Sequence, residues 1–216
     1  MLYNLSEHTH IANQYIADLR DIQCQSHKGR FRHNMQRLAE FFAYEISQHL
    51  DYQQVEIETP LGLATSSILK DQLVLAGILR AGLPLHQGLL HVFDAAENAF
   101  ISSSRMHHKD GSFHIRSEMV SCPNIEGKVL IIADAVIATG ASMQQAIESI
   151  LSYGKPKAIH LVCAICSTDG LNLISRLYPE AHLWIGAEDE ELTAKSYVVP
   201  GLGNAGDLSF GEKQRD

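Results

Sequence analysis

Residues 129–142, VLIIADAVIATGAS, combine residue types suited to binding a phosphorylated ligand. An apolar, β-branched run ends near an acid, Asp134, and small residues follow at positions 138–142 before an amphipathic segment. A buried strand running into such a turn at a helix start binds phosphate, because unpaired backbone N–H groups and the positive end of the helix dipole face the anion. An acid at the strand's end suits hydroxyls or a metal ion beside that phosphate. This segment therefore predicts a site for a phosphorylated sugar or a nucleotide.

A second strand-turn-helix pattern, GILRAGL at residues 77–83, has an arginine at its turn. One interpretation is a second anion site, in which backbone N–H groups and the guanidinium of Arg80 hold another phosphate. The alternative is a surface arginine beside a helix cap. Two such turns in one sheet favour the first interpretation and predict a ligand with separated phosphates.

The C-terminal segment YVVPGLGNAGD, residues 197–207, has three glycines and a proline within seven residues. This composition predicts an irregular backbone that is neither helix nor strand. A stiff loop with exposed N–H and C=O groups can bind the edge of a flat heterocycle, and Asp207 could reach a metal ion or a water molecule. The alternative is a turn that closes the domain.

Alternating strands and helices must position these three segments. The N-terminal third is expected to be a helical arm, with a helix from Arg30 to about Leu50, followed by a polar, proline-containing stretch through Gly62. Apolar runs predict strands at 73–79, 99–103, 129–132, 158–165 and 182–185, with helices at 82–93, 143–151 and 169–178 between them. Residues 104–120 are polar and predict an exposed flap hairpin. The pattern is α/β, with a doubly wound, mostly parallel sheet flanked by helices and ligands beyond the carboxyl ends of its strands.

Length and composition limit the classes of protein to which the chain can belong. The 216 residues show no repeat or long linker, so we expect a single domain over residues 1–216. A net charge of −8 argues against a nucleic-acid partner. No segment approaches the ~20 apolar residues that cross a membrane, and no signal peptide is visible. Four scattered cysteines favour a reducing cytoplasm, and the acidic run at 188–191 is expected to be a solvated surface.

The three segments together resemble the uracil phosphoribosyltransferase family. The resemblance rests on residues 134–142, ILRAG at 78–82 and residues 197–207, and it extends to RFR at 30–32 and Tyr44-Glu45. In that family these segments are a phosphoribosyl-pyrophosphate loop, a pyrophosphate loop and a uracil-binding loop. The resemblance therefore implies a phosphoribosyltransferase-like fold. It also implies transfer of a phosphoribosyl group from phosphoribosyl pyrophosphate, as its Mg²⁺ complex, to uracil N1, giving UMP and pyrophosphate.

The resemblance also assigns site residues. It implies that Asp134 holds the ribose hydroxyls, that Arg80 neutralises the pyrophosphate, and that Asp207 lies near the metal ion and the pyrophosphate, chiefly contacting the metal through it. The 5′-phosphate would be held by Ala138, Thr139, Gly140, Ala141 and Ser142. Uracil would be bound by backbone groups of the segment Val199, Gly201, Leu202 and Gly203. Catalysis in such a site is mostly positioning and electrostatic stabilisation, with Asp134, Arg80 and Asp207 as the catalytic set.

The chain departs from the family's pattern at several positions. Ala135 replaces a proline and Ala141 a glycine in the first segment, and both changes keep the phosphate-binding N–H groups. A flap arginine that reaches the pyrophosphate in the family falls on His108, with Arg105 three residues earlier as a substitute. The C-terminal segment has Asn204 in place of an aspartate and Leu208 in place of a basic residue.

Two functions are therefore compared. The first is the enzyme, and three intact loops favour it. The second is a phosphoribosyltransferase-fold sensor that binds phosphoribosyl pyrophosphate or a nucleotide with little or no turnover, and the departures at positions 108, 204 and 208 favour it slightly. The resemblance implies a homodimer or higher homo-oligomer through the N-terminal helices. Lys28, Arg30 and Arg32 lie where the family could place a regulatory nucleotide such as GTP or a subunit contact, or they form an ordinary helix start.

Overall fold

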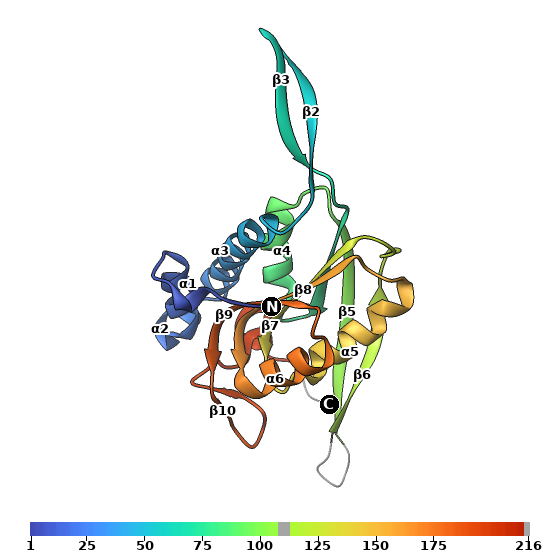
Figure 1. Ribbon diagram of the computed structural model, residues 1–216. Coiled ribbons are helices and arrows are strands. Elements are labelled where there is room, and N and C mark those ends of the chain that lie inside the picture. Colours follow the sequence, from blue (N-terminus) through green and yellow to red (C-terminus); the bar gives the residue numbers. More distant parts are fainter. Residues whose placement is uncertain (108–112, 214–216) are drawn as a thin grey trace.

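A seven-stranded sheet forms the centre of the protein in the computed structural model, which describes residues 1–107 and 113–213 (Figure 1). The strand order is β1-β9-β8-β7-β4-β5-β6, and every neighbouring pair is parallel except β5 and β6. The strands are β1 (Leu2–Asn4), β4 (Leu73–Leu79), β5 (Glu97–His107), β6 (Phe113–Ser121), β7 (Val129–Ile137), β8 (Ala158–Ser167) and β9 (His182–Asp189). The predicted flap hairpin is thus present, as β5 and β6.

Helices cover both faces of this sheet. A cluster of buried apolar residues lies between the sheet and the helices on each face. Successive residues of β7 alternate between the clusters, with Ile131 and Ala133 in one and Leu130 and Ile132 in the other. The first cluster includes residues of α1 (Ala12–Arg20), α3 (Lys28–Ser47) and α4 (Leu83–Val92). The second includes residues of α5 (Ala141–Ile150) and α6 (Thr168–Leu177). The doubly wound, mostly parallel sheet predicted from the sequence is confirmed.

Neighbouring strands β4 and β7 continue into helices on opposite faces. After β4 the chain enters α4, whose Leu85 and Leu89 belong to the first cluster, whereas after β7 it enters α5, whose Ile147 belongs to the second. The strand order therefore reverses between β4 and β7. In open α/β sheets, ligands bind outside the carboxyl ends of the strands at such a reversal. Two of the three predicted ligand-binding segments follow these two strands.

Several elements differ from the expectation. The N-terminus adds strand β1 to the sheet edge and a short helix, α2 (Ile22–Gln25), lies between α1 and α3. The polar stretch after α3, to which no strand was assigned, forms an antiparallel hairpin of β2 (Tyr52–Thr59) and β3 (Gly62–Leu69), which extends away from the body of the molecule (Figure 1). The strand expected at 99–103 is longer at both ends, because residues 97–98 pair with β4 and its outer part pairs in the flap hairpin.

A group of aromatic rings lies where β8 and β9 meet the N-terminus. Trp184 Nε1 donates a hydrogen bond to His160 Nδ1 at 3.0 Å, and the rings of His160 and His182 stack with centroids 4.8 Å apart. His160 is almost fully buried. Burial, with smaller contributions from the neighbouring histidines, lowers the pKa of His160 to about 3, and burial also lowers the pKa of His182 and of His86 in α4.

We expect these histidines to make the protein less stable in mild acid. Between about pH 6.5 and 3 the unfolded chain binds a proton at residue 160 that the folded protein excludes, so stability falls as the pH falls through this range. From His160 alone the free energy of unfolding should drop by about 2 kcal/mol between pH 7 and pH 5. Urea denaturation at the two pH values measures this drop. His160→Gln, which keeps a hydrogen-bond acceptor and cannot titrate, should reduce it, whereas an unchanged drop in that variant would contradict the assignment.

Candidate functional site

The turn after β7, residues 138–142, is called the phosphate loop below. It leads into the ten-residue helix α5, whose N-cap residue, Gly140, has no side chain to cap the first N–H groups. Gly140 adopts φ +82°, a left-handed conformation that favours glycine and turns the chain into the helix. Uncapped N–H groups at a helix start are available to an anion. A small pocket opens here and is lined by Asp134, Val136, Ile137, Ala138, Thr139, Gly140, Ser142 and Met143.

Neighbouring groups hold the phosphate loop in shape. Thr139 Oγ1 accepts a hydrogen bond from the N–H of Ala141 at 3.4 Å. Ser167, which ends β8 and caps α6, donates from its hydroxyl to the carbonyl of Ala138 and accepts from the N–H of Gly170 at 2.9 Å. The loop is therefore fixed by the neighbouring strand and helix. Ser167 was not singled out from the sequence, although a serine before a helical segment is a recognisable N-cap.

Asp134 lies in β7 directly below this loop and is 8% exposed. Its Oδ1 accepts a hydrogen bond from the N–H of Ala135 at 2.7 Å. The carboxylate belongs to the pocket lining, together with residues of the phosphate loop. Its charge also helps to raise the pKa of the Cys163 thiol on β8, an effect caused mainly by burial.

The turn after β4, residues 80–82, is called the Arg80 turn. Gly82 packs so closely on β7 that a Cβ atom there would lie 2.3 Å from the carbonyl oxygen of Ala133, the neighbour of Asp134. The Leu79–Arg80 peptide bond is cis. Arg80 Nη2 pairs with Asp207 Oδ1 at 3.0 Å, and both side chains are about one-third exposed (32% and 28%). The family resemblance implies that both residues lie near one pyrophosphate, and the fold brings their side chains into contact.

The segment after β9, residues 197–207, is called the C-terminal loop, and part of its expected structure is wrong. It was predicted to contain neither helix nor strand, yet Val198–Val199 form β11, which pairs with β10 (Glu191–Leu192). Its end starts a short helix, α7 (Ala205–Phe210). Asn204 caps this helix, accepting from the N–H groups of Gly206 and Asp207, and its amide donates to Asp207 Oδ2 at 2.6 Å. The departure at position 204 thus keeps a helix cap, because asparagine is as good an N-cap as aspartate.

Residues 200–203 of the C-terminal loop do not follow regular structure, as predicted. Gly201 adopts φ +57°, and a Cβ atom there would lie 2.2 Å from the carbonyl of Val198. Its N–H donates to Asp189 Oδ2 at 2.9 Å and its C=O accepts from Arg20 Nη1 at 3.0 Å. Leu202 is buried in the first cluster, whereas Val199 and Gly203 lie at the surface. Since the backbone groups of Gly201 are bonded within the protein and Val199 pairs with Glu191 in the β10–β11 ladder, Gly203 is the best placed of the three to meet a base.

Sequence reasoning missed Arg20 and misjudged Asp189. The acidic run 188–191 was expected to be a solvated surface, but Asp189 is 7% exposed and forms two hydrogen bonds with Arg20, each 2.8 Å long. The expectation was wrong for Asp189, because the guanidinium of Arg20 offsets the free-energy cost of burying its carboxylate. The partner lies 169 positions away, and no local signal in the sequence connects the two.

The remaining predicted residues belong to the flap hairpin and to the start of α3. Arg105 lies in β5, where its backbone is opposite Ile115 of β6, and His108 falls outside the described residues. Of the basic residues at the start of α3, Lys28 is exposed, Arg30 pairs with Asp18 at 2.8 Å, and Arg32 donates to the carbonyl of Ser209 in α7 at 2.6 Å.

A resident metal site is not evident in the part of the chain that the structure describes. Residues 1–107 and 113–213 contain no group of three or more His, Cys, Asp or Glu side chains that could hold an ion. Mg²⁺ is commonly held by one or two carboxylates together with substrate phosphates. Asp207, which pairs with Arg80 and is partly exposed, is a carboxylate of the kind that such an arrangement uses.

Comparisons with known proteins agree over nearly the whole chain. A family model described as uracil phosphoribosyltransferase matches residues 6–212. A protein of Porphyromonas gingivalis named uracil phosphoribosyltransferase is 44% identical over 209 residues, covering 96% of each chain. A protein of the same name from Pyrococcus furiosus is 34% identical over 202 residues, covering 92% of this chain and 85% of the relative. A solved structure of a protein from Aquifex aeolicus superposes with a TM-score of 0.87 at 27% identity, covering 98% of each chain.

Proposed function

Since this chain belongs to the uracil phosphoribosyltransferase family, we propose that it transfers the phosphoribosyl group of phosphoribosyl pyrophosphate to uracil N1, giving UMP and pyrophosphate. The observation that carries this proposal is the meeting of the phosphate loop and the Arg80 turn at one strand-order reversal, with Asp207 of the C-terminal loop paired to Arg80. A sensor that binds the same ligands without turnover remains the second candidate. The N-cap formed by Asn204 removes one of the reasons for preferring it.

Different site residues bind different parts of the two substrates. The N–H groups and hydroxyls of Ala138 to Ser142 bind the 5′-phosphate, and Asp134, directly below, accepts hydrogen bonds from the ribose hydroxyls. Arg80 faces the pyrophosphate, exchanging its pairing with Asp207 for the ligand's negative charge. Backbone groups of the C-terminal loop, chiefly at the exposed Gly203, bind the edge of uracil. The position of each residue and the family resemblance support these proposed roles.

The reaction breaks the bond between ribose C1 and a pyrophosphate oxygen, forms the bond from C1 to uracil N1, and passes the N1 proton to the departing pyrophosphate or to water. Negative charge grows on the leaving pyrophosphate and positive charge on the ribose ring. Arg80 stabilises the first, and the buried carboxylate of Asp134 lies beside the second. Catalysis comes from fixed charges and from holding the reacting atoms together, and no covalent intermediate with the protein is required.

UMP formation from uracil, phosphoribosyl pyrophosphate and Mg²⁺ tests the proposal, with cytosine, orotate, hypoxanthine and adenine assayed in parallel. Turnover with uracil alone is expected. Absence of turnover with every base, together with a thermal shift on adding phosphoribosyl pyrophosphate, would support the sensor instead.

We also propose that the protein is a homodimer and that the β2–β3 hairpin contributes to its interface. The hairpin extends away from the body (Figure 1) and carries exposed apolar side chains, among them Leu61 (99% exposed) and Leu63 (71% exposed). A two-stranded hairpin is only marginally stable by itself in water, and clustered exposed apolar residues mark interaction sites. Packing against a second copy would bury these side chains and stabilise the hairpin.

Shortening the hairpin should produce a monomer. The hairpin base is closed by Lys157, which bridges Asp51 and Asp71, so replacing residues 53–68 by a two-residue Asn-Gly turn keeps this closure and the Tyr52–Leu69 pair. Light scattering should give a dimer mass for the unaltered protein and a monomer mass for the shortened one. An unaltered protein that is monomeric, or a shortened one that remains dimeric, would contradict this role.

Three further assignments stay predictions. Mg²⁺ enters as the complex of the pyrophosphate substrate, with Asp207 as its nearest protein carboxylate. A GTP effector remains a prediction for the basic residues at the start of α3. The cytoplasm remains the expected compartment; all four cysteines are free, and no helix within the described residues is long and apolar enough to cross a membrane.

A further inference from the structure

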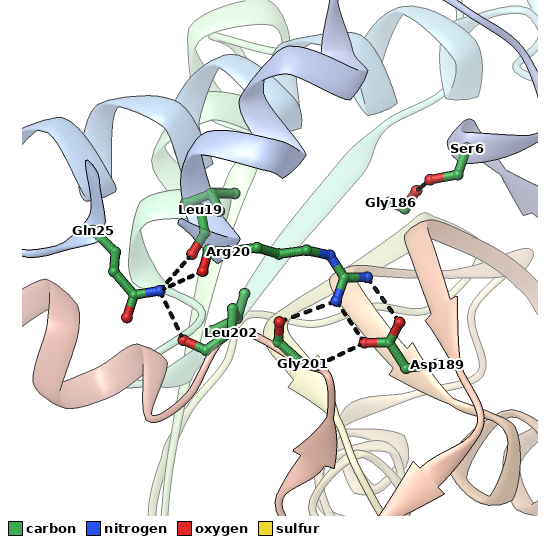
Figure 2. A network of polar contacts seen from close by, with 8 residues as sticks. All are labelled: Ser6, Leu19, Arg20, Gln25, Gly186, Asp189, Gly201 and Leu202. Carbon is green, nitrogen blue, oxygen red and sulfur yellow. Dashed lines mark hydrogen bonds and ion pairs between the residues drawn. The ribbon is translucent and has the colours of Figure 1, made fainter. Parts of the chain in front are cut away.

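Arg20, Asp189 and Gly201 form a closed set of hydrogen bonds at the back of the C-terminal loop (Figure 2). Two guanidinium nitrogens of Arg20 donate to the two carboxylate oxygens of Asp189, each at 2.8 Å. Arg20 Nη1 also donates to the carbonyl of Gly201 at 3.0 Å, and the N–H of Gly201 donates back to Asp189 at 2.9 Å. Both backbone polar groups of Gly201 are thereby fixed by one ion pair.

The surroundings make this ion pair strong and directional. The side chain of Asp189 is 6% exposed and that of Arg20 is 24% exposed, so water screens the pair less than it screens an ordinary surface pair. Two parallel charge-assisted hydrogen bonds also fix the relative orientation of the two groups. Leu202, the residue after Gly201, is held as well. Gln25 Nε2 donates to its carbonyl at 3.4 Å and to the carbonyls of Leu19 and Arg20 at 3.1 Å (Figure 2).

The anchored glycine lies between Val199, which pairs with Glu191 of β10, and Gly203, which is proposed to meet the base. Gly203 follows Gly201 by two residues, so a rotation of the Gly201 peptide groups would redirect the backbone groups of Gly203. The anchor comes from two distant elements, since Arg20 ends α1 and Asp189 ends β9. The N-terminal helical arm therefore sets the shape of the loop proposed to bind uracil.

We propose that Arg20 and Asp189 are positioning residues that hold the C-terminal loop in its uracil-binding conformation without touching the substrate. The inference rests on the proposed function, because it assigns the base to this loop. A loop ordered before binding loses less conformational entropy when uracil binds, which increases affinity for the base. Phosphoribosyl pyrophosphate is bound chiefly by the phosphate loop and the Arg80 turn, so its binding should depend little on this pair.

This difference between the two substrates separates positioning from general structural support. Asp189→Asn keeps the size of the side chain and removes its charge, and we expect KM for uracil to rise about tenfold or more while KM for phosphoribosyl pyrophosphate stays within about twofold. Arg20→Lys keeps the charge and loses the two-pronged contact, so it should raise KM for uracil by an intermediate factor. Arg20→Gln combined with Asp189→Asn should cost little more than either change alone, because the two groups act as a unit.

Asp71→Asn is the matched control. Asp71 is also an almost buried carboxylate, 10% exposed at its side chain, that binds a cation, Lys157 at 2.5 Å, and a backbone N–H, that of Asp51 at 2.8 Å. It lies before β4, at the opposite end of that strand from the Arg80 turn. Its replacement should leave both KM values unchanged.

An unchanged KM for uracil in Asp189→Asn and Arg20→Lys, or an equal rise in both KM values, would overturn the inference. If Asp189→Asn does not fold, Arg20→Lys and Arg20→Gln provide the same comparison. Failure of the proposed function is distinguishable, because it would appear as an unaltered protein that makes no UMP.

Discussion

Replacing Asp134 by asparagine is expected to lower the rate of UMP formation by about 10²–10³-fold while the thermal midpoint stays within a few degrees. Asparagine has the same shape and keeps the oxygen that accepts from the N–H of Ala135, so the fold of β7 should persist. The change removes the negative charge beside the ribose and one of two acceptors for its hydroxyls. Steady-state kinetics with uracil and differential scanning calorimetry measure the two effects.

The control for this prediction is again Asp71→Asn, which removes another almost buried carboxylate outside the site and should leave the rate unchanged. A variant Asp134→Asn that loses much of its stability, yet retains normal activity in its folded fraction, would show that Asp134 is structural. Equal loss of activity in the Asp71 variant would also contradict a specific role.

The second large effect is expected at Arg80. Arg80→Gln should raise KM for phosphoribosyl pyrophosphate and lower kcat, with a combined loss in kcat/KM of about 10²-fold or more, because a charged donor facing the pyrophosphate is removed. Stability should change little, since the ion pair with Asp207 is partly exposed on both sides. Isothermal titration with phosphoribosyl pyrophosphate separates the binding loss from the kinetic one.

Arg176→Gln provides the comparison for Arg80, because Arg176 is an exposed arginine in the last turn of α6. It should bind phosphoribosyl pyrophosphate as the unaltered protein does. If Arg80→Gln retains its affinity for this ligand and its kcat, the pyrophosphate lies elsewhere and the Arg80 turn is only a structural connection.

Much of the fold was predictable because buried strands and one-sided helices leave periodic patterns. Strand β4 was predicted with its bounds, and helix α5 buries the apolar residues expected from their spacing, such as Met143 and Ile147. The β2–β3 hairpin was missed because neither of its strands packs a face on the core, so no alternation of apolar and polar residues marks it. Helix α7 was missed because it is short and glycine-containing, although Asn204 is a recognisable cap.

The candidate site was predictable where chemistry is local and not where it depends on distant partners. Asp134 lies in a buried strand, and Arg80 and the phosphate loop each follow one, so this pattern can be read from a few neighbouring residues. The burial of Asp189 depends on Arg20, far away in the sequence, and four consecutive acidic residues indicated a solvated surface instead. Pairing across the fold therefore decides which acid in the run is structural.

The most direct test of the whole site is a crystal structure of the protein with UMP. The predicted result is a phosphate bound to the N–H groups of residues 138–142, ribose hydroxyls on Asp134, and the uracil edge on the backbone of the C-terminal loop near Val199 and Gly203. A nucleotide bound away from these residues, or one whose base does not contact the C-terminal loop, would contradict the account.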